Sequence, residues 1–345
     1  MKIALLFRSN GYGGSVRIAR FIYDILVANG HEVLAMSCRK YEGGGYFDGV
    51  NYTELNIKRY DKDWFYTSRF NFFKDIFSDV DMVITTLNPN YPIIPIIAKK
   101  IGKKVLISEH GNHLGVRGIK KRFLRFLSYK SADLITFVNQ FDVDYFSSFK
   151  NTMLIRNPVL LNLDVKLDKK ENIILFPNRL DDNKRFWFLL KAFAMIDYEV
   201  RKAYKIVVCG DGDCRDEYVK LAAQNGIKLE ILGFVRDIEK YYAKAKIVAL
   251  TSKSEGFGNV LMEAIFFDCA RISVNCKAGP DEIITDNFDG FLCDNLNEFA
   301  KKLEILIRDE AIVAKFVKNA RESADVFLPQ SIEKSWLKAF KRIGA

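Results

Sequence analysis

The sequence lacks a hydrophobic run long enough to cross a membrane. Its most apolar segment, residues 91–98, is short and contains two prolines, whereas a spanning helix needs about 20 apolar residues. The N-terminus has only five consecutive apolar residues before Arg8, fewer than a secretory signal requires. We therefore expect a cytoplasmic protein that begins with a buried strand.

Cysteine and histidine are also scarce. None of the six cysteines forms a Cys-x-x-Cys pair, which favours buried free thiols in a reducing compartment. His110 and His113 have metal-ligand spacing, but no third ligand is evident. Asp-x-Asp pairs occur at 79–81, 142–144 and 211–213, and we attribute them to chance. No metal site is predicted.

Negative charge is scarce in the first half. Residues 1–158 contain 23 Lys and Arg against 14 Asp and Glu, a net charge of +9 out of +10 for all 345 residues. A basic half indicates an anionic partner, such as membrane lipid, a lipid-phosphate acceptor or nucleic acid. A basic surface that only aids solubility is the alternative.

Short β-branched runs alternate with amphipathic stretches along the whole chain. Strands are expected at 2–8, 32–37, 82–86, 104–108, 134–138, 153–156, 173–176, 204–209, 228–232, 247–251 and 271–274, and helices at 15–29, 122–130, 140–150 and 331–342. This alternation predicts an α/β fold with parallel sheets. The pattern pauses near 157 and then restarts. We expect domains at 1–157 and 172–330, a linker at 158–171, and a C-terminal helix at 331–345 that returns to the first domain.

Ligands of such sheets bind beyond the carboxyl ends of the strands, so residues that follow strands are the site candidates. The strongest segment follows the strand ending near Thr251 and contains Glu255, Gly256, Phe257, Gly258, Asn259, Val260, Leu261 and Glu263. Its glycine turn opens a helix whose first amides, from Gly258 to Leu261, can bind a diphosphate. Glu255 can accept hydrogen bonds from sugar hydroxyls, and Glu263 from a ribose. A polar loop with a solvated Glu263 is the alternative interpretation.

Three other segments follow strands. Arg179 and Lys184 are cations that can stabilise charge on a departing phosphate. His110 lies in a Glu-His-Gly-Asn sequence directly after a strand and can contact a transferring sugar. Gly13 and Gly14 lie in a glycine loop after the first strand; this loop matches neither a G-x-G-x-x-G nor a Walker pattern, so we interpret it as a place where a substrate approaches the backbone.

Taken together in this order, these motifs resemble glycosyltransferase family 4, which has the GT-B fold. The resemblance spans nearly the whole chain, through SEHGN, NRLDDNK, CGDGDCRDEYVKLA, LGFVRDIEKYY, SEGFGNVLMEA and CKAGPDEIITDNFDGFL. It implies two doubly wound Rossmann-like domains that face a central cleft. One departure is Asn178, where the family usually has glycine before the arginine.

The resemblance also implies residue roles and a reaction. Arg179 and Lys184 would hold the donor diphosphate with amides at 259–261, and Glu255 the donor sugar. Glu263 would bind the ribose, Phe234 and Val235 the base, and His110 the reacting sugar. The enzyme would be a retaining hexosyltransferase, without metal or cofactor, that uses a nucleotide sugar, with UDP expected. The leaving diphosphate would help to deprotonate the incoming hydroxyl.

The nearest members implied by the resemblance build bacterial surface glycans. They transfer hexoses or N-acetylhexosamines to polyprenyl-diphosphate-linked or lipopolysaccharide (O-antigen) acceptors. The first domain would then bind the acceptor and the second the nucleotide sugar.

A basic amphipathic segment at 116–130 has six cations and no acid, which predicts a peripheral contact with the inner face of an anionic cytoplasmic membrane. Aromatic residues at 64–77 could receive a lipid tail or could form core. The first alternative function is a nucleotide-sugar epimerase or hydrolase on the same fold without a glycan acceptor. A Rossmann oxidoreductase is disfavoured by the missing third glycine, and a nucleic-acid-binding protein by the lack of a recognised module.

Overall fold

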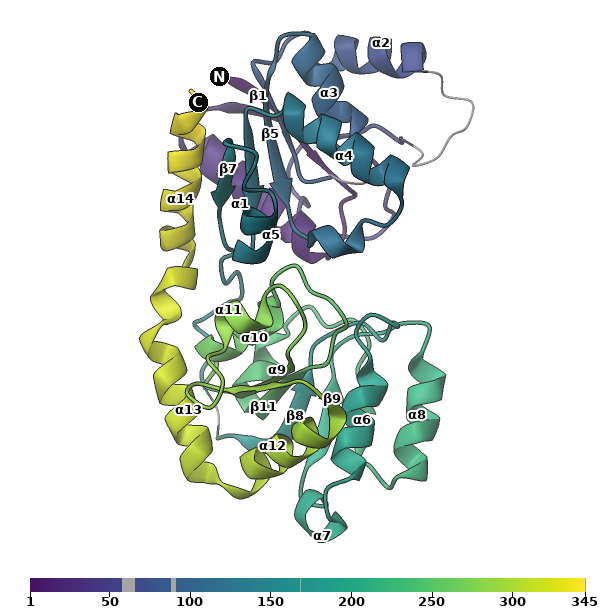
Figure 1. Cartoon of the computed structure of the whole chain (residues 1–345), viewed down its shortest axis with the longest axis vertical. Coiled ribbons are helices and arrows are strands. Elements are labelled where there is room, and N and C mark those ends of the chain that lie inside the picture. Colours follow the sequence, from purple (N-terminus) through teal and green to yellow (C-terminus); the bar gives the residue numbers. More distant parts are fainter. Residues whose placement is uncertain (58–65, 88–90, 168, 345) are drawn as a thin grey trace. The chain divides into compact units, whose positions relative to one another are not determined.

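The computed structural model describes residues 1–57, 66–87, 91–167 and 169–344. They form two compact units: unit 1 contains Met1–Asn157 and Ile332–Ala345, and unit 2 contains Pro158–Ser331 (Figure 1). Among the described residues, no helix combines the length and the hydropathy of a bilayer-spanning segment. All six cysteines are free and most are buried.

Unit 1 is built on a parallel sheet whose described strands run in the order β3-β2-β1-β4-β5-β6-β7. The strands are β1 (Lys2–Phe7), β2 (Glu32–Ser37), β3 (Tyr52–Glu54), β4 (Met82–Thr85), β5 (Lys104–Glu109), β6 (Leu134–Phe137) and β7 (Thr152–Leu154). Every residue of β1 after Lys2 is buried, as expected for a strand covered on both faces by helices.

The helices of unit 1 connect these strands. They are α1 (Gly14–Ala28), α2 (Tyr66–Ile76), α3 (Ile93–Lys100), the 3-10 turn η1 (His113–Gly115), α4 (Ile119–Ser131), α5 (Gln140–Tyr145) and most of α14 (Pro329–Arg342). One core cluster joins alternate β1 residues, Ala4 and Leu6, to Ile94 and Ile97 of α3. In α14, Arg342 donates to backbone carbonyls of Lys150 and Thr152 beside β7, so the C-terminal residues belong to unit 1.

Unit 2 repeats this architecture with a sheet of order β10-β9-β8-β11-β12-β13. The strands are β8 (Glu171–Phe176), β9 (Lys205–Val208), β10 (Leu229–Ile231), β11 (Ala245–Leu250), β12 (Ala270–Val274) and β13 (Phe291–Cys293). The helices are α6 (Phe186–Ala194), α7 (Tyr198–Arg201), α8 (Arg215–Gln224), α9 (Glu239–Lys244), α10 (Asn259–Phe266), α11 (Pro280–Ile283), α12 (Leu296–Arg308), α13 (Glu310–Glu322) and the 3-10 turn η2 (Ala324–Phe327). The sheet and the aromatic helix α6 share one large core cluster.

Strand order reverses at one point in each sheet. In unit 1 the chain moves outward from β1 to β2, then returns to β4 on the other side; in unit 2 it moves outward from β8 and returns to β11. All described strand pairs are parallel. The loops after β8 and β11 therefore leave the same edge in opposite directions, which creates the ligand-binding position of a doubly wound sheet.

The predicted strands are confirmed to within two residues, but β3 and β13 were missed. Both have only three residues at a sheet edge, as do β7 and β10, which were predicted. The helix predicted at 140–150 is wrong beyond Tyr145, because Phe146 and Phe149 pack around Tyr129 instead. Of the aromatic cluster at 64–77, Phe73 and Phe77 are core residues; Trp64 and Phe65 lie outside the described residues.

A buried ion pair stabilises the far end of the unit 2 sheet. Arg271 of β12 is fully buried, lies 3.1 Å from the Asp289 carboxylate, and donates to the carbonyls of Ile283 and Asp289. Asp289 also accepts from the amide of Thr285. The pair therefore holds the loop between α11 and β13 against the sheet.

Asp289→Ala is expected to lower the free energy of unfolding by about 3–5 kcal/mol, because it leaves the Arg271 charge buried without its partner. Glu230→Ala, which breaks the half-exposed pair with Lys205, is the control and should cost at most about 1 kcal/mol. Urea titration of both variants tests this, and similar losses would contradict it.

Candidate active site

Two loops meet at the switch point of the unit 2 sheet, one after β8 and one after β11. Lys184 Nζ lies 2.6 Å from Glu255 Oε1, and the side chains are only 16% and 12% exposed. These residues are 71 positions apart in the sequence. The structure thus brings together two of the predicted site residues as a largely buried, charge-assisted pair.

Further hydrogen bonds hold these two loops together. Arg185 donates to the carbonyls of Thr251 and Ser252 at 2.8 and 3.0 Å, and the Thr251 hydroxyl donates back to the Lys184 carbonyl at 2.8 Å. Asn183 donates from its side chain to the Ser254 carbonyl at 3.0 Å. Because these bonds tie the residues on either side of Lys184 to the segment just before Glu255, they fix the positions of both members of the pair.

The turn after Glu255 opens α10 as the sequence predicts. Gly258 caps the helix with φ of 96°, a left-handed conformation that suits glycine. The prediction that the Leu261 amide is free is wrong: it donates to the Gly258 carbonyl at 2.9 Å, and its side chain is fully buried. Within the described residues, no hydrogen bond leaves the Val260 amide, so this donor is available to an anion at the helix start.

Glu263 lies one helical turn further into α10 and is buried, which contradicts the alternative of a solvated residue. The Tyr242 hydroxyl of α9 donates to Glu263 Oε2 at 2.9 Å. Tyr242 is itself fully buried, so one carboxylate oxygen is oriented by a rigid partner.

The other predicted residues of unit 2 are less enclosed. Arg179 is mostly exposed and pairs with Asp181 at 2.7 Å, so the structure does not place it in the Lys184–Glu255 pair. Phe234 is exposed and Val235 half-buried in the loop after β10. Gly233, directly before them, forms a bridge with Gly210 after β9, which brings these two loops together.

Three glycines position the loops, and motif reasoning missed them. A Cβ atom at Gly210 would lie 2.1 Å from the Asn178 carbonyl oxygen, one at Gly212 2.4 Å from that of Leu180, and one at Gly279 2.0 Å from that of Phe257. A real Cβ cannot approach so closely. The glycines of the CGDGD segment and of the loop after β12 therefore let neighbouring loops pack on the two segments that carry Lys184 and Glu255.

Cys276 also lies near this pair. Burial raises the pKa of its thiol to about 12, with the Glu255 charge acting in the same direction. The thiol therefore stays protonated and is no nucleophile at neutral pH.

Unit 1 places its predicted residues after β1 and β5. Gly13 caps α1 with an extended φ of −133°, and a Cβ there would meet no atom within 4 Å. Neither the backbone nor the packing of unit 1 requires glycine at this position. Gly14 is the first residue of α1.

His110 directly follows β5, and its Nε2 atom lies 3.1 Å from the Ser108 hydroxyl. Burial of the ring lowers the pKa of His110 to about 4. The nearby Asn157 side chain acts in the opposite direction, although no hydrogen bond of good geometry reaches Nδ1. The ring is therefore neutral near pH 7.

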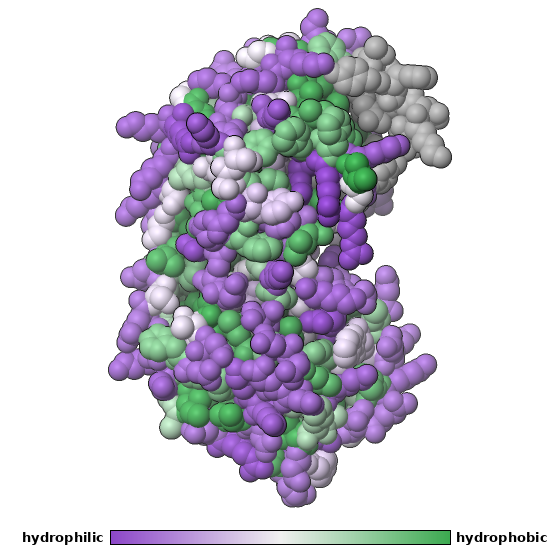
Figure 2. All heavy atoms as spheres, in the orientation of Figure 1, coloured by the Kyte–Doolittle hydropathy of each residue, from purple (hydrophilic) through white to green (hydrophobic). Residues whose placement is uncertain are grey.

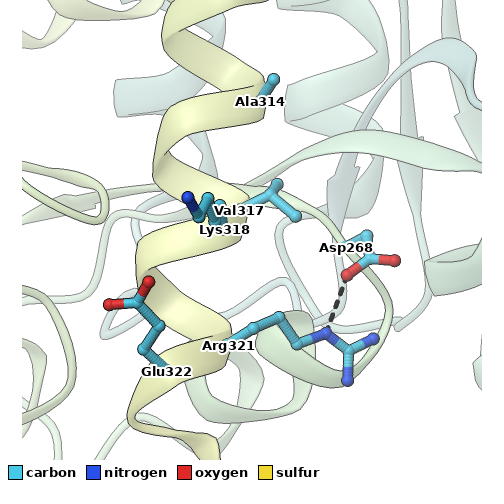
Figure 3. A pocket seen from close by; sticks show the side chains of 6 residues that line it. All are labelled: Asp268, Ala314, Val317, Lys318, Arg321 and Glu322. Atoms are coloured by element: carbon cyan, nitrogen blue, oxygen red, sulfur yellow. Dashed lines mark hydrogen bonds and ion pairs between the residues drawn. The ribbon is translucent and has the colours of Figure 1, made fainter.

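An open groove on unit 2 is lined by α13 and the turn before β12, where Arg321 reaches Asp268 at 2.8 Å (Figure 3). It lies at the amino ends of the strands, opposite the edge that carries Lys184. In the part of the chain that is described, no group of three His, Cys, Asp or Glu side chains is placed to hold a metal ion.

Comparison with known proteins agrees with this architecture. The family profile described as glycosyl transferases group 1 matches residues 163–323. The chain is 34% identical, over 99% of both chains, to the "GalNAc-alpha-(1->4)-GalNAc-alpha-(1->3)-diNAcBac-PP-undecaprenol alpha-1,4-N-acetyl-D-galactosaminyltransferase" of Campylobacter jejuni. A second C. jejuni relative, "N-acetylgalactosamine-N,N'-diacetylbacillosaminyl-diphospho-undecaprenol 4-alpha-N-acetylgalactosaminyltransferase", is 29% identical over 75% of this chain and 76% of its own.

Among solved structures, "Anabaena Alr3699/HepE in complex with UDP and glucose" superposes with a TM-score of 0.81 at 17% identity, covering 99% of each chain. At this identity the likeness concerns the fold.

The lowered pKa of His110 predicts a pH dependence of stability. Between about pH 6.5 and pH 4 the unfolded chain binds a proton at this ring that the folded chain does not, so the free energy of unfolding falls as the pH falls through this window, by up to about 3 kcal/mol. His110→Asn should reduce this dependence. Urea titrations of both proteins at pH 4.5 and pH 7.5 test it, and equal pH effects would contradict it.

Proposed function

The chain belongs to the glycosyl transferases group 1 family, and we propose that it transfers a hexose or N-acetylhexosamine from a UDP-sugar to a lipid-linked or lipopolysaccharide-type glycan, with retention at the anomeric carbon. The predicted fold class, two doubly wound parallel α/β domains of GT-B type, is confirmed by the two sheets and by the solved structures that share the fold. The names of both C. jejuni relatives specify undecaprenol-linked substrates and alpha linkages, which supports the acceptor class and the stereochemistry.

The observation that carries the proposal is the Lys184–Glu255 pair at the switch point of unit 2. A lysine at the carboxyl edge of a parallel sheet suits the diphosphate of a donor, and the adjacent carboxylate suits the hydroxyls of the attached sugar. In the absence of a ligand the two charges neutralise each other. A bound diphosphate would take up part of the Lys184 charge, and Glu255 would then accept from the sugar.

In the proposed reaction an acceptor hydroxyl attacks the anomeric carbon as the bond to the diphosphate breaks. The hydroxyl proton passes to the leaving phosphate oxygen on the same face of the sugar. Lys184, the exposed Arg179, and the Val260 amide stabilise the developing negative charge. We propose that no metal ion is needed for this role.

The remaining predicted residues complete the donor site in this proposal. Glu263, oriented by Tyr242, binds the ribose hydroxyls, and backbone near Phe234 and Val235 receives the base. In unit 1 the neutral His110 contacts the transferring sugar, and the open space beside Gly13 admits substrate close to the backbone of Gly13 and Gly14. Unit 2 is thus the donor unit and unit 1 the acceptor unit.

The surface of α4 supports a peripheral contact with an anionic membrane. Ile119 is 87% and Phe123 58% exposed, Leu124 and Phe126 are also exposed, and cationic side chains lie among them. Figure 2 shows hydrophobic groups beside strongly hydrophilic ones on the face where α4 is drawn. Arg125 does not contribute, since it is buried with its guanidinium 4.9 Å from the Phe146 ring.

Lys184→Ala is expected to lower kcat by about 30- to 1000-fold, because one contact with the departing diphosphate is worth about 2–4 kcal/mol. Lys253→Ala is the matched control: this lysine lies on the neighbouring loop, after β11, and pairs with the exposed Asp182, and its loss should leave kcat within about twofold. Near-normal turnover of Lys184→Ala at saturating donor would refute the assigned role.

The same assay tests the cofactor proposal and the alternative function. Activity should persist in EDTA. Product should form only when a glycan acceptor is present, whereas a nucleotide-sugar epimerase or hydrolase would act without one.

Lys120→Ala/Lys121→Ala should weaken binding to vesicles that contain anionic lipid by about 30-fold, since each cation near the surface contributes about 1 kcal/mol. The control is Lys205→Ala/Lys228→Ala on unit 2. Flotation of the wild type and both double variants with vesicles at two salt concentrations measures this binding. Binding that changes neither with salt nor in Lys120→Ala/Lys121→Ala would contradict the proposal.

A further inference from the structure

Unit 1 contains a histidine–aspartate pair that the proposed reaction does not use. His113 begins η1 after β5, and Asp142 lies in the first turn of α5 after β6. Because β5 and β6 are adjacent parallel strands, both residues lie at the carboxyl edge of the sheet. This is the edge that also carries His110.

The geometry of the pair is tightly defined. Asp142 Oδ1 lies 2.6 Å from His113 Nδ1 and accepts from the His113 amide at 3.0 Å. The Asp142 amide in turn donates to the Asn139 side chain at 2.7 Å. His113 is 8% exposed and Asp142 2%. The carboxylate therefore holds the imidazole in one orientation, as in other histidine–carboxylate pairs.

The second ring nitrogen of His113, Nε2, can bind another partner. In the neutral form of the ring, Nδ1 carries the proton because it faces a carboxylate, and Nε2 presents its lone pair as a hydrogen-bond acceptor. Across the described ranges of the chain, Nε2 makes no hydrogen bond, and it is not among the enclosed polar atoms that lack a partner. Nε2 is therefore not fully enclosed by the described residues.

An exposed aromatic ring lies directly against the face of this imidazole. Tyr145 stacks on His113 with 3.7 Å between the ring centroids and an interplanar angle of 6°, yet it is 57% exposed. Phe141 lies nearly parallel on the same helix, 4.8 Å from the His113 ring. A fixed hydrogen-bond acceptor next to an exposed aromatic surface is a combination that suits a sugar, which has both hydroxyls and an apolar ring face.

We propose that His113 Nε2 accepts a hydrogen bond from a hydroxyl of the acceptor sugar, whose ring lies against Tyr145, and that Asp142 is the residue that positions His113. This rests on the proposed transfer to a glycan. The lone pair of His113 Nε2 can bind a sugar hydroxyl but not the lipid diphosphate, because phosphate oxygens accept hydrogen bonds and do not donate them.

The competing explanation is that the pair only ties η1 to α5. His113→Asn separates the two, since the asparagine amide can still donate to Asp142 from near the position of Nδ1, whereas no atom replaces Nε2. His31→Asn is the matched control: His31 precedes β2, at the amino edge of the same sheet.

With the full-length enzyme, His113→Asn should raise the acceptor KM about tenfold, as expected for one lost hydrogen bond. The donor KM should stay unchanged, kcat should stay within about twofold, and His31→Asn should match the wild type. The wild type should also be assayed with a set of acceptors that each lack one hydroxyl. For one of these acceptors the KM of the wild type should rise by about the same factor, and with His113→Asn the removal of that hydroxyl should cause no further rise in KM. An unchanged acceptor KM in His113→Asn overturns the proposal.

A second experiment compares the acceptor KM of wild type and His113→Asn for acceptors that carry a diphosphate and acceptors that do not. The effect of His113→Asn should be equal for both; an effect confined to the diphosphate-bearing acceptor also overturns the proposal. If the variant is unstable, nitrogen-15 NMR of the wild type replaces it: the Nε2 signal of His113 should shift on adding acceptor and not on adding donor, and a signal that stays unchanged contradicts the contact. A wild type that transfers sugar to no glycan would instead refute the proposed function itself.

Discussion

The parallel pairing of β8 with β11 is the constraint on which the candidate donor site depends. Their register aligns Ile174 with Ile247 and Leu175 with Val248, so the loops that follow both strands leave the same edge of the sheet. Lys184 and Glu255 meet there although 71 positions separate them in the sequence. Because the strand order reverses at this point, the connections that follow β8 and β11 diverge, toward β9 and toward β12.

The loops themselves are held by backbone contacts more than by side-chain packing. Arg185 adopts a left-handed φ of 47°, which is uncommon for a residue with a Cβ, and its guanidinium reaches two carbonyls of the neighbouring loop. Gly210, Gly212 and Gly279 allow the adjoining loops to approach within distances that a side chain would forbid. Such a site is pre-organised, which suits stabilisation of a short-lived charge without movement of the protein.

Unit 1 uses the same topology for a different chemistry. Its two histidines after β5 are three positions apart, yet their surroundings differ: His110 lies beside the Ser108 hydroxyl in an environment that lowers its pKa, whereas His113 is bonded to a carboxylate. Exposed hydrophobic groups on α4 and an exposed Tyr145 lie in this unit. Neutral, aromatic and cationic groups therefore predominate on the proposed acceptor side, where the acid Asp142 is bonded to His113.

The sequence by itself determined the α/β class, the positions of most strands and the segments that carry Lys184, Glu255, Glu263 and His110, because strand periodicity and glycine turns are local signals. Only the tertiary structure decided which of these side chains meet. It paired Lys184 with Glu255, turned Arg179 outward, engaged the Leu261 amide and buried Arg125. It also joined His113, rejected from the sequence as a metal ligand, to Asp142. Such contacts depend on strand order and on the packing of distant loops, which no local pattern encodes.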